Sequence, residues 1–147
     1  MPIETRIALV LGLLALAVAA GLFWRSRSGK AKQIAGGEQI DLAEIGAVKN
    51  GVAVTKFGQK VTFLQFSSEF CTACRQTAKL YGELEQVHPE ILHIEVDITN
   101  RTDLANKFNI LQTPTTLVLD ARGRVTSRIG GAVKQQTIED EIGSFEI

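Results

Sequence analysis

The stretch TFLQFSSEFCTACR, residues 62–75, runs from an apolar, strand-like segment into a Cys-x-x-Cys motif. The chain contains no cysteine other than Cys71 and Cys74. After the motif, small or apolar residues recur at three- and four-residue steps, which predicts one face of an amphipathic helix. The motif is therefore expected at the start of a helix that follows a buried strand. The residues of that predicted face are Ala78, Tyr81, Leu84 and Val87.

The start of a helix suits the redox chemistry of a pair of thiols. A thiol there faces unpaired backbone N–H groups and the positive end of the helix dipole, so its pKa is expected to fall below that of a free thiol. Residues i and i+3 of a helix also bring their Cα atoms within disulfide range. The spacing therefore predicts reversible oxidation of the Cys71–Cys74 pair.

Two other uses of these cysteines stay open. Together with His88 and His93 they have the spacing of a C2H2 zinc site. A zinc finger, however, carries its cysteines on a hairpin and both histidines on one helix, whereas here the predicted helix follows the cysteines and Pro89 separates the histidines. Two buried structural thiols are the other alternative, because free cysteine is often part of a core. The redox interpretation is favoured, with no metal and no cofactor.

Residues 7–24, IALVLGLLALAVAAGLFW, carry no charged or strongly polar side chain. At about 1.5 Å per residue, such a helix approaches the hydrocarbon thickness of a bilayer, which predicts one transmembrane helix after a short tail, residues 1–6. A cleaved signal peptide is the alternative, because Ala17-Val18-Ala19 offers small residues for a peptidase. The apolar run continues past that site to Phe23 and Trp24, which suit an interfacial anchor, so an uncleaved span is favoured.

The formal net charge is +0, yet its distribution along the chain is uneven. Four basic residues follow the apolar segment within eight positions, so the Lys/Arg bias predicts a single-pass cell-membrane protein whose C-terminal domain is cytoplasmic. An extracytoplasmic domain is the alternative. The remainder of the chain is correspondingly acidic, and no nucleic-acid partner is expected. The four basic residues are Arg25, Arg27, Lys30 and Lys32.

Residues 25–39 are basic, rich in Ser, Gly and Ala, and lack apolar periodicity, which predicts a flexible linker. Residues 40–147 are expected to form one domain. Its order of strand, helix, strand, helix, hairpin and helix indicates an α/β class. The expected elements are a short helix or strand at 40–45, β runs at 52–57 and 60–66, the helix after Cys74, a strand at 91–98, a helix at 103–108, strands at 115–119 and 124–129, and a helix at 137–145.

Residues 60–145 resemble a thioredoxin domain. The resemblance rests on the apolar strand, on Phe70-Cys71-x-x-Cys74 at a helix start, and on Thr113-Pro114-Thr115 about forty residues later, before the terminal hairpin. It implies a thioredoxin-like fold, with a central mixed sheet flanked by helices. With the preceding apolar helix, the chain resembles a membrane-anchored bacterial thioredoxin-like protein.

The resemblance also implies roles for single residues. Cys71 matches the exposed nucleophile of the family and Cys74 its buried resolving thiol. Pro114 matches the cis-proline that lies against the dithiol and leaves the backbone of Thr113 free to pair with a substrate, although an ordinary trans proline is the alternative. Phe70 stands beside the nucleophile, where the family usually has Trp.

Two residues depart from the family pattern beneath the dithiol. Gln65 stands where a buried Asp is usual, and Glu95 stands where a Lys often pairs with that Asp. An amide cannot take a proton from Cys74, so help in deprotonating this thiol is expected from water or from Glu95.

The function that the resemblance implies is thiol–disulfide exchange by a membrane-tethered oxidoreductase. A cytoplasmic domain would be kept reduced and act as a reductase. The expected partners are disulfide-containing protein substrates, a redox protein that resets the dithiol, and the lipid bilayer. The alternatives are a tethered, non-catalytic binding module and an extracytoplasmic thiol oxidase or isomerase.

Overall fold

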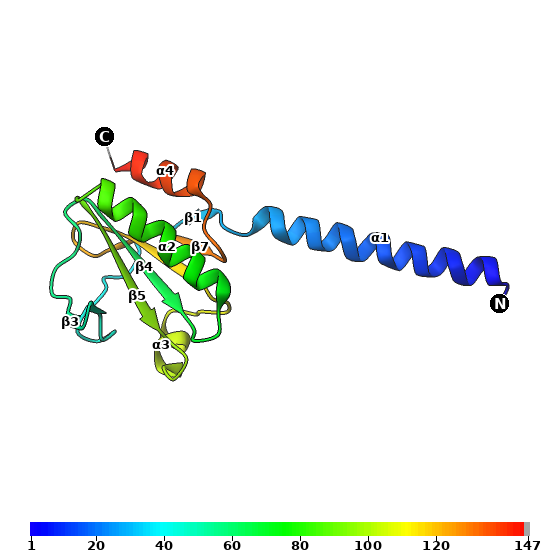
Figure 1. The fold of residues 1–147 in the computed structure, drawn as a ribbon, viewed down its shortest axis with the longest axis horizontal. Coiled ribbons are helices and arrows are strands. Elements are labelled where there is room, and N and C mark those ends of the chain that lie inside the picture. Colours follow the sequence, from blue (N-terminus) through cyan, green and yellow to red (C-terminus); the bar gives the residue numbers. More distant parts are fainter. Residues whose placement is uncertain (146–147) are drawn as a thin grey trace.

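The computed structural model describes residues 1–145, in which a long N-terminal helix projects from an α/β domain (Figure 1). The elements follow one another in the order predicted for the domain, with an added strand directly after the long helix. They are α1 (Ile3–Arg27), β1 (Ala31–Gln33), β2 (Val48–Lys49), β3 (Val52–Ala53), β4 (Val61–Ser67), α2 (Thr72–Val87), β5 (Ile91–Asp97), α3 (Thr102–Lys107), β6 (Thr115–Asp120), β7 (Val125–Gly130) and α4 (Gln135–Ser144).

The central sheet is mixed, as predicted. Its strand order is β1-β7-β6-β4-β5, with β4 and β5 parallel and the other neighbours antiparallel. All seven residues of β4 are buried, because this strand has a neighbour on each side and packed layers on both faces. This explains why the run before the Cys-x-x-Cys motif is continuously apolar rather than alternating.

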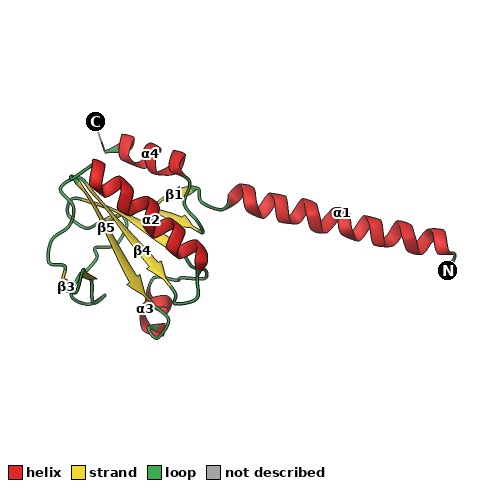
Figure 2. Ribbon diagram, in the orientation of Figure 1, coloured by secondary structure: helices red, strands yellow, loops and turns green. Residues whose placement is uncertain are grey.

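Two hydrophobic clusters cover the two faces of the sheet. Phe63 of β4 packs with Tyr81 of α2 and Ile138 of α4 on one face, and Figure 2 shows these two helices side by side over the sheet. The next residue of β4, Leu64, packs with Leu104 of α3 on the opposite face. Alternate residues of one strand therefore hold both layers in place.

Helix α1 is long and apolar enough to cross a bilayer, and none of its residues is buried in the protein. The amphipathic prediction for α2 is confirmed at Tyr81, which is fully buried, and is wrong at Val87, which is 72% exposed at the last position of the helix. The predicted C-terminal helix is confirmed, with Ile138 and Ile142 facing the core.

The prediction of a flexible linker at residues 25–39 is wrong for much of that segment. Helix α1 continues to Arg27, and β1 pairs antiparallel with β7 at the edge of the sheet. Gln39 forms a further bridge with Arg124. Pairing at a sheet edge uses backbone N–H and C=O groups, so it requires no apolar pattern in the side chains.

The two segments between β1 and β4 also differ from expectation. Residues 40–45 form turns rather than a helix or strand, yet Ile40 and Ile45 are buried in the cluster on the α3 face. The predicted β run at 52–57 is a strand only at Val52–Ala53, in a small hairpin with β2. Apolar residues here cover the sheet from an irregular chain, which periodicity cannot reveal.

Candidate active site

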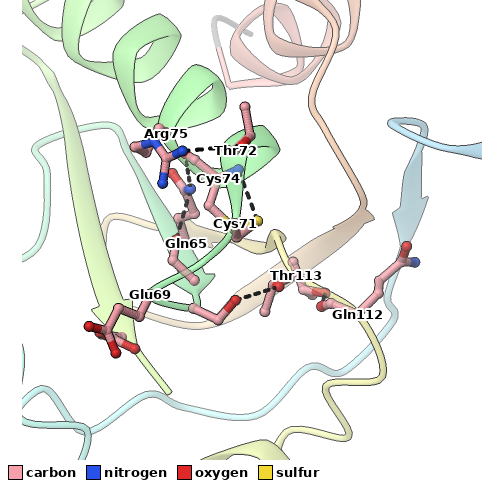
Figure 3. The surroundings of a disulfide bond; sticks show 12 residues. Gln65, Glu69, Cys71, Thr72, Cys74, Arg75, Gln112 and Thr113 are labelled. Carbon is pink, nitrogen blue, oxygen red and sulfur yellow. Dashed lines mark hydrogen bonds between the residues drawn. A yellow bond between two sulfur atoms is a disulfide. The ribbon is translucent and has the colours of Figure 1, made fainter. Parts of the chain in front are cut away.

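Cys71 and Cys74 are joined by a disulfide at the start of α2, with their Cα atoms 5.2 Å apart. Cys71 is the N-cap residue, and its Sγ accepts a hydrogen bond from the backbone N–H of Cys74 over 3.1 Å. Cys74 is only 2% exposed, whereas Cys71 is partly exposed. The outer cysteine is thus accessible and the inner one is covered, and Figure 3 shows both at the start of α2.

The loop between β4 and α2, which leads into the motif, contacts other parts of the domain at two points. The hydroxyls of Ser68 and Thr113 lie within hydrogen-bond distance, 3.1 Å apart, and the N–H of Glu69 donates to Thr99 Oγ1 over 2.9 Å. Phe70, directly before the outer cysteine, is 89% exposed. An aromatic side chain of this size in solvent offers apolar contact area beside the disulfide.

The Thr113–Pro114 peptide bond is cis. The carbonyl oxygen of Pro114 accepts a hydrogen bond from the N–H of Gly131 over 2.8 Å, which joins this loop to the turn after β7. Through Thr113 the same loop contacts the loop that precedes Cys71. The structure therefore brings the two sequence motifs, about forty residues apart, into one site.

Gln65 is fully buried on β4 beneath α2. Its Nε2 donates to the carbonyl oxygen of Cys74 over 2.9 Å and to Ser67 Oγ over 3.0 Å, while its Oε1 lies 2.9 Å from His93 Nε2. Because both amide N–H groups are used, Oε1 must be the acceptor and His93 Nε2 must carry the proton. The amide thus ties the inner cysteine to a buried histidine.

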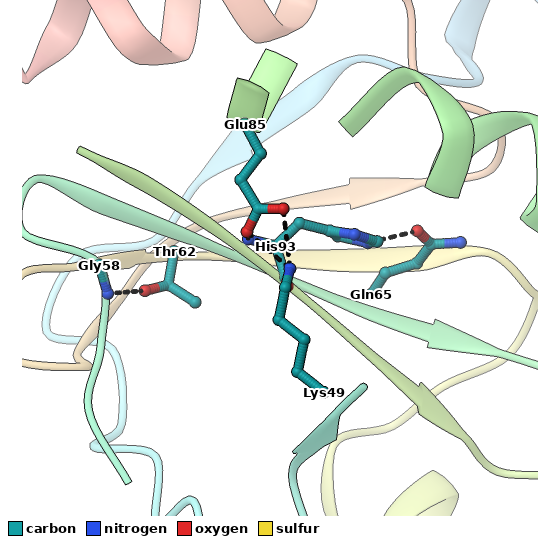
Figure 4. A network of polar contacts seen from close by, with 6 residues as sticks. All are labelled: Lys49, Gly58, Thr62, Gln65, Glu85 and His93. Carbon is teal, nitrogen blue, oxygen red and sulfur yellow. Dashed lines mark hydrogen bonds and ion pairs between the residues drawn. The ribbon is translucent and has the colours of Figure 1, made fainter. Parts of the chain in front are cut away.

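His93 belongs to a polar network that is not predicted from the sequence (Figure 4). Its ring is stacked on Tyr81 with centroids 5.0 Å apart, and its backbone N–H donates to Glu85 Oε1 over 2.9 Å. Lys49 Nζ bonds both Glu85 and the carbonyl oxygen of His93. Burial, followed by the nearby charge of Lys49, lowers the pKa of His93 to about 4, although Glu85 acts in the opposite direction. The group below Gln65 is therefore neutral at pH 7.

One signal in the sequence could have indicated this network. Gln65 and His93 are the polar residues that interrupt two otherwise apolar stretches of strand, at 63–66 and 91–94. A buried polar side chain needs a hydrogen-bond partner, so two such residues on neighbouring strands are candidates for each other.

Glu95 lies opposite Gln65 in the register of β4 and β5. Its side chain reaches solvent, but partial burial, followed by the nearby charge of Asp97, raises the pKa of its carboxyl group. Within residues 1–145, no hydrogen bond or ion pair joins Glu95 to Gln65 or to either cysteine.

The zinc alternative does not fit the geometry. His88 caps the end of α2 opposite to Cys71, and a 16-residue helix is about 24 Å long, too far for one shared ion. His93 Nε2 is turned toward Gln65 instead. The part of the chain that the structure describes holds no group of three or more His, Cys, Asp or Glu residues placed to bind a metal.

Comparison with known proteins assigns the domain that carries this site to a family. The thioredoxin family profile matches residues 39–144. Thioredoxin H5 of Oryza sativa subsp. japonica is 31% identical over 72 residues, which cover 49% of this chain and 53% of the rice protein. The chain spans little more than half the length of the curated rice thioredoxins that it matches.

Two solved structures agree with this assignment. Reduced Schistosoma mansoni thioredoxin pre-protein is 27% identical, with a TM-score of 0.51 over 60% of this chain and 81% of that chain. A poplar thioredoxin h is 26% identical, with a TM-score of 0.52 over 58% of this chain and 76% of that chain. Since the family profile covers nearly the whole domain that carries the disulfide, the chain belongs to the thioredoxin family.

Proposed function

We propose that this chain is a membrane-tethered thiol–disulfide oxidoreductase that reduces protein disulfides through Cys71 and Cys74. The observation that carries the proposal is the position of this pair, with one partly exposed and one buried sulfur at the start of α2. Membership in the thioredoxin family supports the same activity. No cofactor is needed for it.

In the reduced protein, the thiolate of Cys71 attacks one sulfur of a substrate disulfide. A mixed disulfide forms, and the other substrate sulfur leaves as a thiolate that takes a proton from water. The thiolate of Cys74 then attacks Cys71 Sγ, which forms the disulfide seen here and releases the second substrate thiol. Two electrons pass to the substrate, and a dithiol redox protein restores them to the pair.

The residues around the pair have different tasks in this proposal. The backbone of Thr113, before cis-Pro114, pairs with an extended substrate segment, and exposed Phe70 contributes apolar contact. Gln65 supplies no base to Cys74, so the proton of this thiol passes to water or to Glu95. The raised pKa of Glu95 makes its carboxylate a better proton acceptor.

The tether in this proposal is α1. A lone apolar helix of 25 residues with no buried side chain is stabilised by a bilayer rather than by the protein. The basic residues after it favour a cytoplasmic domain, where cellular thiols keep the pair reduced. The direction of thiol–disulfide exchange is thus linked to the side of the membrane, because an extracytoplasmic domain would act in oxidation or isomerisation.

Turnover of a disulfide peptide by the full-length chain in detergent tests the activity. With a dithiol as electron donor, the wild-type chain should reduce the peptide catalytically and Cys71→Ser should not. Cys74→Ser should instead accumulate a mixed disulfide with the peptide. A tethered module that only binds its partner would give neither turnover nor the trapped species.

The side of the membrane is tested separately by a membrane-impermeant maleimide. Because the chain has no other cysteine, labelling reports only on Cys71 and Cys74. In intact cells the reduced pair should stay unlabelled until the cells are opened. Labelling of intact cells would contradict the cytoplasmic, reductive assignment.

A further inference from the structure

Helix α1 joins the domain without a spacer. It ends at Arg27, and only Ser28 precedes Gly29, whose N–H donates to the carbonyl oxygen of Gly130 over 2.8 Å. Gly29 has a φ of +75°, and a Cβ atom there would lie 2.4 Å from the carbonyl oxygen of Ala132. Only glycine fits so close an approach, so the chain is fixed to the domain within two residues of the helix end.

The turn after β7, to which Gly29 is bonded, also borders the loop before β6 that contains the cis-proline, called here the cis-proline loop. Gly131 donates to the carbonyl oxygen of Pro114, and a Cβ atom on Gly130 would lie 2.7 Å from Gln112 Nε2. In Figure 3, Gln112 and Thr113 lie between the cysteines and the light-blue strand that follows α1. A single loop therefore separates the end of the anchor helix from the disulfide.

The side chains on this edge suit the surface of a membrane. A cleft of about 370 Å³ lies between the end of α1 and the cis-proline loop, and Phe23, Trp24, Arg27 and Gln112 are among the residues that line it. Leu111, on the same loop, is 87% exposed and borders a second hollow with Lys30 and Lys32. Tryptophan at the end of an apolar helix lies at headgroup level, and lysines beside it attract anionic lipids.

From this arrangement we infer that the disulfide substrate of this protein is part of a second membrane protein and lies close to that protein's own membrane-spanning segment. The inference rests on the proposed tethering and thiol exchange. A long flexible linker would let the domain sample many heights above the bilayer, whereas the fixed junction holds the cis-proline edge near the headgroups. Two partners confined to one membrane and matched in height meet at a high effective concentration.

The experiment compares disulfides at two heights. The full-length chain is pre-reduced and placed in phosphatidylcholine–phosphatidylglycerol vesicles with a single-span reporter peptide. In the near reporter a disulfide loop follows the apolar segment directly. In the far reporter a helical spacer of about 20 residues raises it by about 30 Å. A soluble peptide with the same disulfide loop measures exchange that does not depend on height.

A lifted variant carries a ten-residue helical insertion between Arg27 and Ser28, which raises the domain by about 15 Å. The matched control carries the same insertion before Ile3, where it leaves the junction with the domain unchanged. The wild-type chain and the control should reduce the near reporter at least about tenfold faster than the far one, as expected when fixed geometry excludes one site. The lifted variant should lose this preference yet reduce the soluble peptide at the wild-type rate.

Equal rates on both reporters for the wild-type chain would overturn the inference, as would an unchanged preference in the lifted variant. Failure of every chain to reduce the soluble peptide would instead refute the proposed exchange activity. Failure to float with the vesicles would refute the proposed tether. Each of these results is distinct from a failure of the height preference alone.

Discussion

The side-chain amide of Gln65 donates a hydrogen bond to the carbonyl oxygen of Cys74 over 2.9 Å, so a neutral group lies beneath the inner cysteine. The same amide accepts from His93, whose pKa is lowered by burial. Both side chains beneath Cys74, the amide of Gln65 and the imidazole of His93, are therefore uncharged at pH 7. Deprotonation of the Cys74 thiol should therefore be the slow step in resolving the mixed disulfide at neutral pH.

The substitution Gln65→Asp should accelerate the attack of Cys74 on a mixed disulfide by roughly tenfold or more near pH 7, because a carboxylate can accept the thiol proton. It should also lower the free energy of unfolding by about 1–3 kcal/mol, because a charged group must be buried. Gln65→Leu is the control, with a similar loss of stability and no acceleration. The rate of thiol release is measured by stopped flow. An unchanged rate in Gln65→Asp would mean that another base already deprotonates Cys74.

His93 should contribute to stability mainly through its hydrogen bond to Gln65. His93→Phe keeps an aromatic ring against Tyr81 but leaves the buried Oε1 of Gln65 without a donor, which should cost about 1–3 kcal/mol. The matched control is His88→Phe, at the partly exposed end of α2, with an expected change within about 0.5 kcal/mol. Equal losses in the two variants, measured by urea unfolding in micelles, would count against the buried network.

The stability of the full-length chain should fall as the pH drops from about 6.5 toward 4. In that window the unfolded chain binds a proton at His93 that the folded chain does not bind, because burial lowers the folded pKa to about 4. The neighbouring Lys49 opposes protonation of the folded form, whereas Glu85 favours it. The shift corresponds to a loss on the order of 3 kcal/mol between these pH values.

The pH effect of His93 is obtained as the difference between wild type and His93→Gln, since other carboxylates also titrate in acid. The variant should show a flatter pH dependence between 6.5 and 4. Parallel curves for the two proteins would mean that His93 binds its proton equally in the folded and unfolded states.

Strand β1 should be required for a well-folded soluble domain. A fragment of residues 28–147 keeps β1 on the edge of β7 and keeps the bond from Gln33 Nε2 to Glu141 Oε1, over 3.0 Å. A fragment of residues 38–147 exposes that edge and removes one partner of a carboxylate that is 4% exposed. Size-exclusion chromatography should therefore show aggregation of the shorter fragment, and equal behaviour of the two would contradict the role of β1.

The sequence predicts those parts of the site that are encoded by patterns of neighbouring residues. The apolar run of β4, the Cys-x-x-Cys motif and the face of α2 occupy about 25 consecutive residues, so periodicity and capping identify them together. The position of Pro114 beside the pair comes from the family resemblance, because no local pattern joins segments that lie forty residues apart. The cis bond in the structure agrees with that resemblance.

The parts that the sequence does not reveal depend on contacts between distant segments. β1 is defined by backbone pairing with β7, almost one hundred residues later in the chain, and its composition resembles that of a linker. The His93–Gln65 bond requires knowledge that β4 and β5 are neighbours. Likewise, the backbone hydrogen bond from Gly29 to Gly130 joins two segments that lie far apart in the sequence.

The most direct test of the account is the relative reactivity of the two thiols in the reduced, full-length chain. The partly exposed position of Cys71 at the helix cap and the burial of Cys74 predict that iodoacetamide at pH 7 modifies Cys71 at least about tenfold faster. Mass spectrometry of the peptide that contains both residues gives the two rates in one experiment. Selective modification of Cys71 would support its role as nucleophile, and equal rates at the two cysteines would contradict it.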